Sequence, residues 1–432
     1  MTHCREEILR YHDGGKVGTL LTKPLTGQDT LSIAYTPGVA LPVKEIARDP
    51  GMLYACTAKR NLVAVVSDGT AILGLGDLGA AASIPVMEGK AVLFKAFGDV
   101  DAWPVPLDGC RANGGSAGRT DPERVIETVR RLAPMYGGVN LEDIAAPACF
   151  EIEERLDAEL DIPVFHDDQW GTAVITLAGV FNYAALTDRR LGDLRCVING
   201  AGAAGIRIAD MLREAGLGAI LVCDSKGVLR ADRADLNPMK RRAAVDTPLR
   251  TLQDALRGAH LFVGVSAADC LPAEWVRAMA DTPGIFAMAN PDPEVRPDQV
   301  AAVMGSRPYI MATGRSDYPN QINNVLGFPF LFRGALDVRA SCINMAMKKA
   351  AARALADLAR EPVPEAIRAL YRAPDLAFGP GYLVPKPFDR RLLLNVSMAV
   401  ARAAVESGAA RYPDGLRDYP AQIERRMAAM WR

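Results

Sequence analysis

Short apolar runs, many of them followed by a helical pattern, recur along most of this chain. Strands are predicted over residues 61–66, 91–94, 162–165, 195–198, 218–223, 260–265, 284–289 and 309–312. Helices are predicted over residues 121–132, 151–160, 173–185, 206–215, 334–358 and 391–404. Because strands and helices alternate, we expect an α/β fold.

Two segments match the glycine pattern GxGxxG, and they predict different structures. The first runs from Gly74 to Gly79 and is followed by Pro85. A proline at that position is expected to end the next helix within about two turns. We therefore interpret the first match as a tight strand-to-helix turn and not as the main dinucleotide site.

The second match, Gly200, Gly202 and Gly205, follows a predicted strand and opens an uninterrupted helical pattern. The next strand ends at Asp224, close to where a Rossmann unit places its ribose-binding carboxylate. The cofactor-binding residues that we expect are Gly200, Ala201, Gly202, Ala203, Gly205 and Asp224. Lys226 follows Asp224 closely enough to meet a 2′-phosphate, so the sequence leaves NAD and NADP open.

These units divide the chain into three parts. A chain of 432 residues exceeds what a single core usually supports. We expect an N-terminal α/β domain for substrate and metal over residues 1–165 and a Rossmann-type, doubly wound NAD(P)-binding domain over residues 166–333. The helical segment 334–432 is expected to pack back on them.

Acidic residues gather at the ends of two predicted strands. Asp167 and Asp168 follow one strand, and Glu142 and Asp143 lie shortly upstream. On an extended segment the two aspartates would point to opposite sides and serve different partners. Oxygen ligands from two strand ends suit a partly open Mg²⁺ or Mn²⁺ site, although such acids also cap helices or pair with arginines.

Four other side chains are candidates for chemistry. Tyr35 precedes a Thr-Pro-Gly turn, and Lys90 stands at the start of the predicted strand 91–94. Burial there would lower the pKa of Lys90 towards that of a general base. Asn290 and Asn324 follow predicted strands, where open α/β sheets bind ligands. Each residue also has a common structural role: half-buried packing for the tyrosine, snorkelling for the lysine and turn formation for the asparagines.

Composition narrows the function classes. The formal net charge is −1 and no basic stripe is present, so no nucleic-acid partner is expected. Eight scattered cysteines without a CxxC pair predict free thiols in a reducing compartment. The first residues lack a signal-peptide pattern, and no apolar stretch is long enough to span a membrane, which together predict a cytoplasmic protein.

Seven segments, in order along nearly the whole chain, together resemble the malic enzyme family, and the short bacterial and archaeal type most closely. They are Ala34–Val39 (AYTPGV), Gly74–Gly79 (GLGDLG), Glu88–Lys95 (EGKAVLFK), Asn140–Ile144 (NLEDI), His166–Ala173 (HDDQWGTA), Asn199–Gly205 (NGAGAAG) and Asn323–Pro329 (NNVLGFP). The resemblance implies oxidative decarboxylation of malate to pyruvate and CO₂, with NAD or NADP and with Mg²⁺ or Mn²⁺.

The resemblance also implies a role for each matching residue. Tyr35 is the general acid and Lys90 the general base, which Asp167 neighbours. Asn290 and Asn324 contact malate or the nicotinamide. The metal ligands are Glu142, Asp143 and Asp168. A homodimer or larger homo-oligomer is the expected assembly.

Two features of this chain depart from what the resemblance leads us to expect, the first of them by comparison with the longer eukaryotic malic enzymes. Those enzymes hold the malate carboxylate with an arginine after an Asp-Gly pair. This chain reads Asp68-Gly-Thr-Ala71, as the short type does, so the sequence does not identify the residue that binds the malate carboxylate. The Gly/Arg/Ser-rich loop at 108–120 is longer than usual and has no assigned role. Two alternatives also remain: a malolactic-type lyase, and a non-catalytic dinucleotide-binding regulator on the same fold.

Overall fold

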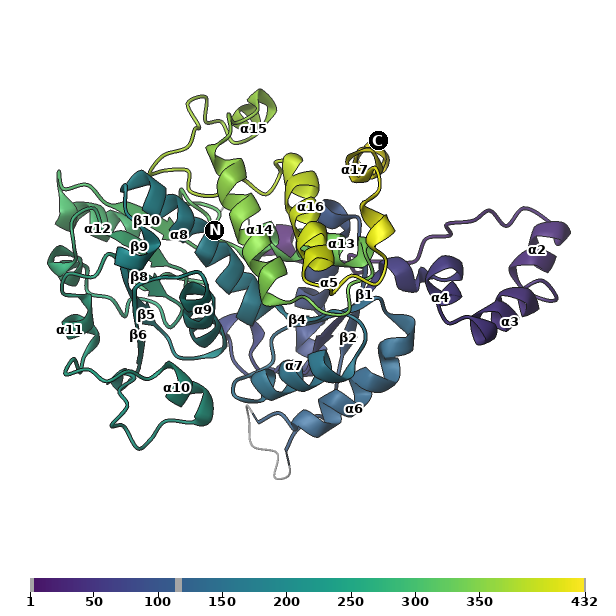
Figure 1. Cartoon of the computed structure of the whole chain (residues 1–432), viewed down its shortest axis with the longest axis horizontal. Coiled ribbons are helices and arrows are strands. Elements are labelled where there is room, and N and C mark those ends of the chain that lie inside the picture. The colour runs from purple at the N-terminus through teal and green to yellow at the C-terminus, as the bar shows by residue number, and fades with distance from the viewer. Residues whose placement is uncertain (1–3, 113–118, 431–432) are drawn as a thin grey trace.

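Two separate sheets, each covered by helices, carry the fold (Figure 1). The computed structural model describes residues 4–112 and 119–430. Their strands and helices match the predicted α/β alternation. All eight cysteines are free thiols, as their spacing predicts. Among the described residues, no helix combines the length and apolar character needed to cross a membrane.

The first sheet is entirely parallel. Its order is β2 (Asp101–Pro106), β1 (Leu62–Ser67), β3 (Gly138–Leu141) and β4 (Val164–His166). The helices in this part of the chain are α5 (Ala80–Gly98), α6 (Pro122–Leu132) and α7 (Ala148–Glu159). Because β3 and β4 are neighbours, the segments that follow their carboxyl ends meet at one edge of the sheet.

The second sheet follows the Rossmann pattern. Its order is β10 (Ile310–Thr313), β9 (Gly284–Ala287), β8 (Leu261–Gly264), β5 (Arg195–Asn199), β6 (Ala219–Asp224) and β7 (Gly227–Val228), with only β7 antiparallel. Its helices are α8 (Thr172–Leu186), α9 (Ala203–Glu214), α10 (Pro238–Ala243), α11 (Leu252–Leu256) and α12 (Pro297–Met304). The strand order reverses between β5 and β8, where such sheets form their ligand crevice.

The C-terminal helices pack back on both parts, as predicted. They are α13 (Phe328–Asp337), α14 (Met345–Arg360), α15 (Glu365–Leu370), α16 (Arg391–Glu406) and α17 (Tyr419–Met430). Helix α14 packs against α8 and α16, and α13 packs against α5. The Asn182 side chain of α8 donates to the carbonyls of Ala356 and Leu383, and these two bonds fasten α14 and the segment 378–388 to the nucleotide side.

Three sequence predictions were wrong in this framework. Pro85 does not end the helix that follows the first glycine segment, because α5 is 19 residues long. Residues 91–94 are not a strand, because helix α5 runs through Pro85 and on to Gly98. Met87, Ala91 and Phe94 are fully buried at helical spacing, and this burial outweighs the cost of about 3 kcal/mol for a proline inside a helix. The helix predicted over 334–358 is also interrupted, since Asn344 caps a separate helix α14.

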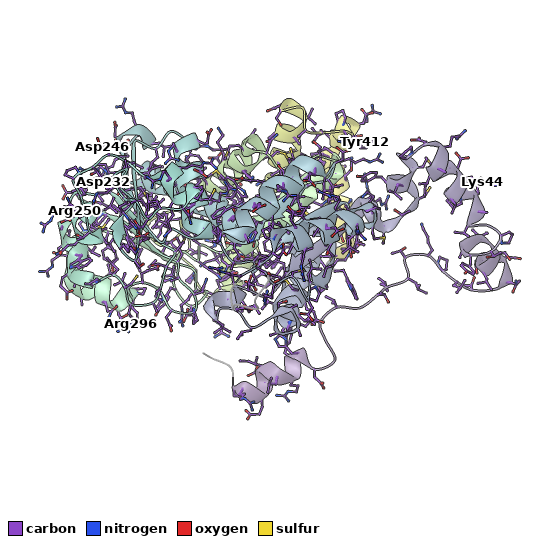
Figure 2. The ribbon with its side chains drawn as sticks, turned by 90° about the horizontal axis from the view of Figure 1, so that it is seen from below. Lys44, Asp232, Asp246, Arg250, Arg296 and Tyr412 are labelled. Carbon is purple, nitrogen blue, oxygen red and sulfur yellow. The ribbon has the colours of Figure 1, made fainter. Side chains whose placement is uncertain are left out.

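The N-terminal segment extends away from both sheets. We call residues 17–58 the arm; it contains α2 (Gln28–Ala34), α3 (Ala40–Arg48) and α4 (Met52–Cys56), and it follows α1 (Arg5–His12). None of its residues is buried. Figures 1 and 2 show α2 and α3 apart from the body in two perpendicular views, with Lys44 at the far end of the molecule.

Candidate metal and nucleotide site

Three carboxylates meet at the carboxyl ends of β3 and β4. One oxygen from each of Glu142, Asp143 and Asp168 lies within 4.8 Å of the others. Asp143 adopts a left-handed backbone conformation (φ 53°), and its N–H donates to Asp168 Oδ2 at 2.8 Å. The sheet order produces this cluster, because it places the segments after β3 and β4 side by side.

The cluster has the chemistry of a divalent cation site. Burial raises the pKa of Glu142 and of Asp168. The pKa of Asp143 is raised to about 7, mainly by burial and to a smaller extent by the negative charge of Asp168. The Oδ2 atom of Asp143 is buried without a hydrogen-bond partner. Three carboxylates this close repel one another unless a cation joins them, and oxygen donors are what Mg²⁺ and Mn²⁺ prefer.

Asp167 and Asp168 serve different partners, but not for the expected reason. They do not lie on an extended strand; residues Asp167–Gly171 form a π-helical turn that opens into α8. Asp167 bonds Lys90, whereas Asp168 joins the acid cluster. The turn separates the two side chains because it is wider than an α-turn and rotates successive residues.

Lys90 is held between two carboxylates. Its Nζ lies 2.6 Å from Asp167 Oδ2 and 3.0 Å from Glu142 Oε1, with the Phe328 ring centroid 4.3 Å away. Burial alone would lower the pKa of Lys90, but the charges of Asp167 and Glu142 outweigh it and raise the pKa above its ordinary value. The predicted lowering is therefore wrong for this arrangement, and Lys90 is protonated in it.

The two asparagines reach the same region from the nucleotide side. Asn324 Nδ2 donates to the carbonyl and to Oδ2 of Asp167, each at 3.1 Å. Asn324 therefore contacts the same carboxylate oxygen that pairs with Lys90. Asn290 is exposed, and a Cβ built on Gly74 would come within 2.9 Å of its carbonyl oxygen. The first glycine segment therefore closes against the second sheet's Asn290 loop.

Tyr35 is the candidate that the structure leaves apart. It lies on the arm, at the end of α2, and 69% of its surface is exposed. Figure 1 shows α2 well separated from α5 and β4, the elements that carry or adjoin Lys90 and the acids. Within one chain, Tyr35 does not join the site.

The second glycine segment forms the expected turn between β5 and α9. Gly200 has φ 122°, and a Cβ there would meet the Val265 carbonyl at 2.4 Å. A Cβ on Gly205 would meet the Gly200 carbonyl at 1.7 Å, so both positions require glycine. Gly202, which caps α9, has open space instead. This open side at a helix N-terminus suits a pyrophosphate.

Asp224 ends β6 as predicted, but basic side chains occupy its carboxylate. Arg233 donates to both oxygens, at 2.9 and 3.0 Å, and Lys240 Nζ lies 2.8 Å from Oδ2. Burial would raise the pKa of Asp224, but the bonds from Arg233 and Lys240 prevail and lower it to about 2. The sequence reading missed Arg233 and Lys240; the density of basic residues between 226 and 242 was the available signal.

The long loop noted in the sequence, 108–120, falls partly outside the described residues, which omit 113–118. Its two flanks come together, since Arg111 and Thr120 form an antiparallel bridge. Arg111 lies near the Asp68 carboxylate at 3.3 Å and near Asp77 at 2.6 Å.

The fold and the site define a two-domain α/β protein in which a Rossmann-type unit adjoins a cluster of buried acids. Residues 14–157 match the family model "Malic enzyme, N-terminal domain", and residues 170–374 match "Malic enzyme, NAD binding domain". The chain belongs to the malic enzyme family.

Individual relatives are similar to this chain in sequence over nearly its whole length. It is 52% identical to the NADP-dependent malic enzyme of Rhizobium meliloti over 98% of this chain and 55% of that protein. The NADP-dependent malic enzyme of Halomonas elongata is 52% identical over 96% of each chain. The crystal structure of malic enzyme from Pyrococcus horikoshii is 38% identical and superposes with a TM-score of 0.86, over 97% of this chain and 95% of that one. The chain spans about half the length of the Rhizobium relative.

Proposed function

We propose that this protein oxidatively decarboxylates malate to pyruvate and CO₂, with NAD(P)⁺ and Mg²⁺ or Mn²⁺. The observation that carries the proposal is Lys90, fixed between Glu142 and Asp167 beside the acid cluster. A buried lysine adjoining a divalent cation site, at the edge where Asn324 arrives from the nucleotide side, suits removal of a hydroxyl proton during hydride transfer.

The residues of this chain divide the chemistry among them. Glu142, Asp143 and Asp168 would hold the cation, which supplies a Lewis acid that polarises the substrate oxygens and draws the Glu142 charge from Lys90. Lys90, kept in place by Asp167, first releases to solvent the proton that it carries between the two carboxylates, and its neutral amine then accepts the C2 hydroxyl proton as the hydride leaves. Asn324 orients Asp167, and Asn290 borders the site where the two domains meet.

A second copy of the chain completes this site in our proposal. The arm exposes a set of apolar side chains: Leu20, Leu21, Leu25, Leu31, Ile33, Tyr35, Leu41 and Val43. An exposed apolar surface of this kind marks an interface, and a twofold dimer lets each arm reach the other body. Tyr35 of one protomer then supplies the C3 proton in its partner's site. We also propose that the domains divide near residues 165 and 333.

The first experiment is a direct assay. The purified chain is incubated with L-malate and Mn²⁺, and the absorbance of reduced cofactor is followed with NAD⁺ and with NADP⁺ separately. Metal-dependent reduction with one pyruvate per reduced cofactor supports the proposal. Lactate without net reduction would identify a malolactic-type lyase, and neither product would leave a dinucleotide-binding protein.

Replacing Asp168 with asparagine should weaken Mn²⁺ binding, because one charged oxygen ligand is lost from the cluster. We expect Asp168→Asn to raise the Mn²⁺ Kd by about tenfold or more, measured by calorimetry. Asp161→Asn is the matched control, since Asp161 is exposed and pairs with Arg411 away from the cluster. Equal Mn²⁺ affinity in Asp168→Asn and the wild type would exclude Asp168 as a ligand.

We propose NADP⁺ as the preferred cofactor. Arg233 and Lys240 neutralise Asp224, the carboxylate that would otherwise repel a 2′-phosphate, and Lys226 Nζ lies 2.8 Å from Asp235 beside them. We expect Lys240→Gln to raise the KM for NADP⁺ by about tenfold and to leave that for NAD⁺ nearly unchanged. Arg242→Gln, an exposed change on the same helix, is the control; an equal effect on both cofactors in Lys240→Gln would refute this role.

A further inference from the structure

One buried arginine of the nucleotide helix holds the turn that carries Asp168. Arg207 lies on α9, just beyond the second glycine segment, and is 4% exposed. Its Nε donates to Gln169 Oε1 at 3.0 Å, and its Nη2 donates to Glu154 Oε1 at 2.8 Å. The helix that begins at the pyrophosphate turn is thus bonded directly to the residue that follows Asp168.

The next residue of the turn, Trp170, is fixed by two cations. The Arg207 guanidinium lies 4.8 Å from its ring, and Lys348 Nζ, from α14, lies 3.8 Å away. The indole Nε1 donates to Glu153 Oε2 at 3.0 Å. Cation–π contacts gain strength when they are desolvated, and Trp170, Arg207 and Lys348 are all buried.

The same carboxylate fixes the start of the turn. Glu153 accepts the N–H of His166 at 3.0 Å, and Arg207 Nη2 lies 3.7 Å from its other oxygen. The residues on either side of Asp167 and Asp168 are therefore held from α7 and α9. Asp168 itself accepts the Asp143 N–H and otherwise faces the acid cluster, so its position follows the position of the turn.

We propose that Arg207 is a positioning residue that couples cofactor binding at the second glycine segment to metal binding at Asp168. This inference rests on the proposed function. Cofactor binding orders the first turn of α9, and Arg207, in that helix, then holds Gln169 and the acid beside it in place. A ligand that orders a shared element lowers the ordering cost for the second ligand, which appears as a coupling of their affinities. Arg207 itself needs to touch neither ligand.

The test measures Mn²⁺ affinity on the full chain, from the electron paramagnetic resonance of free Mn²⁺, with and without saturating NADP⁺. We expect NADP⁺ to tighten Mn²⁺ binding to the wild type by about fivefold or more. In Arg207→Lys, which keeps the charge but loses the planar fork, that ratio should fall below about twofold, with NADP⁺ binding alone little changed. Arg213→Lys is the matched control, because Arg213 lies on the same helix, half exposed, and pairs with Asp210.

A second variant approaches the contact from the other side. Gln169→Met removes the acceptor and leaves Arg207 paired with Glu154, and it should lose the coupling to the same extent. The double variant should lose no more than either single one, as expected for two ends of one contact. Full coupling in both single variants, or an equal loss in Arg213→Lys, overturns the proposal.

The wild type separates this inference from the function on which it rests. Suppose that the wild type oxidises malate and binds Mn²⁺ but has the same Mn²⁺ affinity with and without NADP⁺. That result overturns the proposed coupling and leaves the proposed function standing. A wild type that binds no Mn²⁺ overturns both. Because the readout is a ratio of affinities, a variant that is only less stable does not imitate the expected result.

Discussion

Lys90→Ala should lose malate oxidation by about 10²–10⁴-fold in kcat, the range for removal of a positioned general base. Lys90 Nζ lies between Glu142 and Asp167, and its deprotonated amine is the proton acceptor that we assign to the C2 hydroxyl, so the substitution removes that acceptor. NADP⁺ binding should persist, because the second glycine segment follows β5 of the second sheet, whereas Lys90 lies on α5 beside the first sheet. Steady-state kinetics and NADP⁺ titration of the same preparation measure the two effects.

A matched variant separates proton transfer from charge. Lys90→Arg keeps a cation between the two carboxylates but cannot release its proton near neutral pH, so it should be as inactive as Lys90→Ala. If Lys90 serves only to neutralise Glu142 and Asp167, Lys90→Arg should recover much of the activity. A small primary amine added to Lys90→Ala should restore part of the rate if the missing group is a base. Wild-type turnover in Lys90→Ala would remove Lys90 from the mechanism.

Local patterns predicted most of the fold. Strands β1, β4, β5, β6, β8, β9 and β10 lie close to predicted runs, whereas no run was predicted for β2, β3 or β7. The second glycine segment with its helix was predicted because turn, helix and Asp224 are adjacent in sequence. Residues 91–94 failed for an identifiable reason: four consecutive apolar residues fit a buried strand as well as a buried helix. The burial of Met87, Ala91 and Phe94 at intervals of four and three shows the helical period that separates the two.

The acid cluster could be proposed from the sequence, but its contacts with other residues could not. Glu142, Asp143 and Asp168 were recognisable because acids at neighbouring strand ends converge. The pKa of Lys90 was predicted in the wrong direction, since the sequence could not show that both Asp167 and Glu142 reach its Nζ. Contacts between distant segments set that balance, as they do where Arg233 and Lys240 meet Asp224.

Mixing two inactive variants should restore activity if Tyr35 acts in the partner's site. Tyr35→Phe removes the phenol, and Lys90→Ala removes the base. When the two variants are mixed in equal amounts and allowed to exchange subunits, half of the dimers are heterodimers. In each heterodimer the intact Tyr35 of one chain reaches the intact Lys90 of the other, so one of the two sites is complete. We expect about a quarter of wild-type activity.

The expected activity of the mixture distinguishes a Tyr35 that acts in the partner's site from one that acts in the site of its own chain. If Tyr35 served its own chain, every site in a heterodimer would carry one defect, and the mixture would be as inactive as its components. The structure favours the shared site, because Tyr35 is 69% exposed on an arm without a single buried residue, while Lys90 is enclosed by α5 and the turn after β4. A control mixture in which both variants carry Lys90→Ala should stay inactive, which shows that recovery needs both intact groups. Full subunit exchange without recovery would place Tyr35 outside the partner's chemistry.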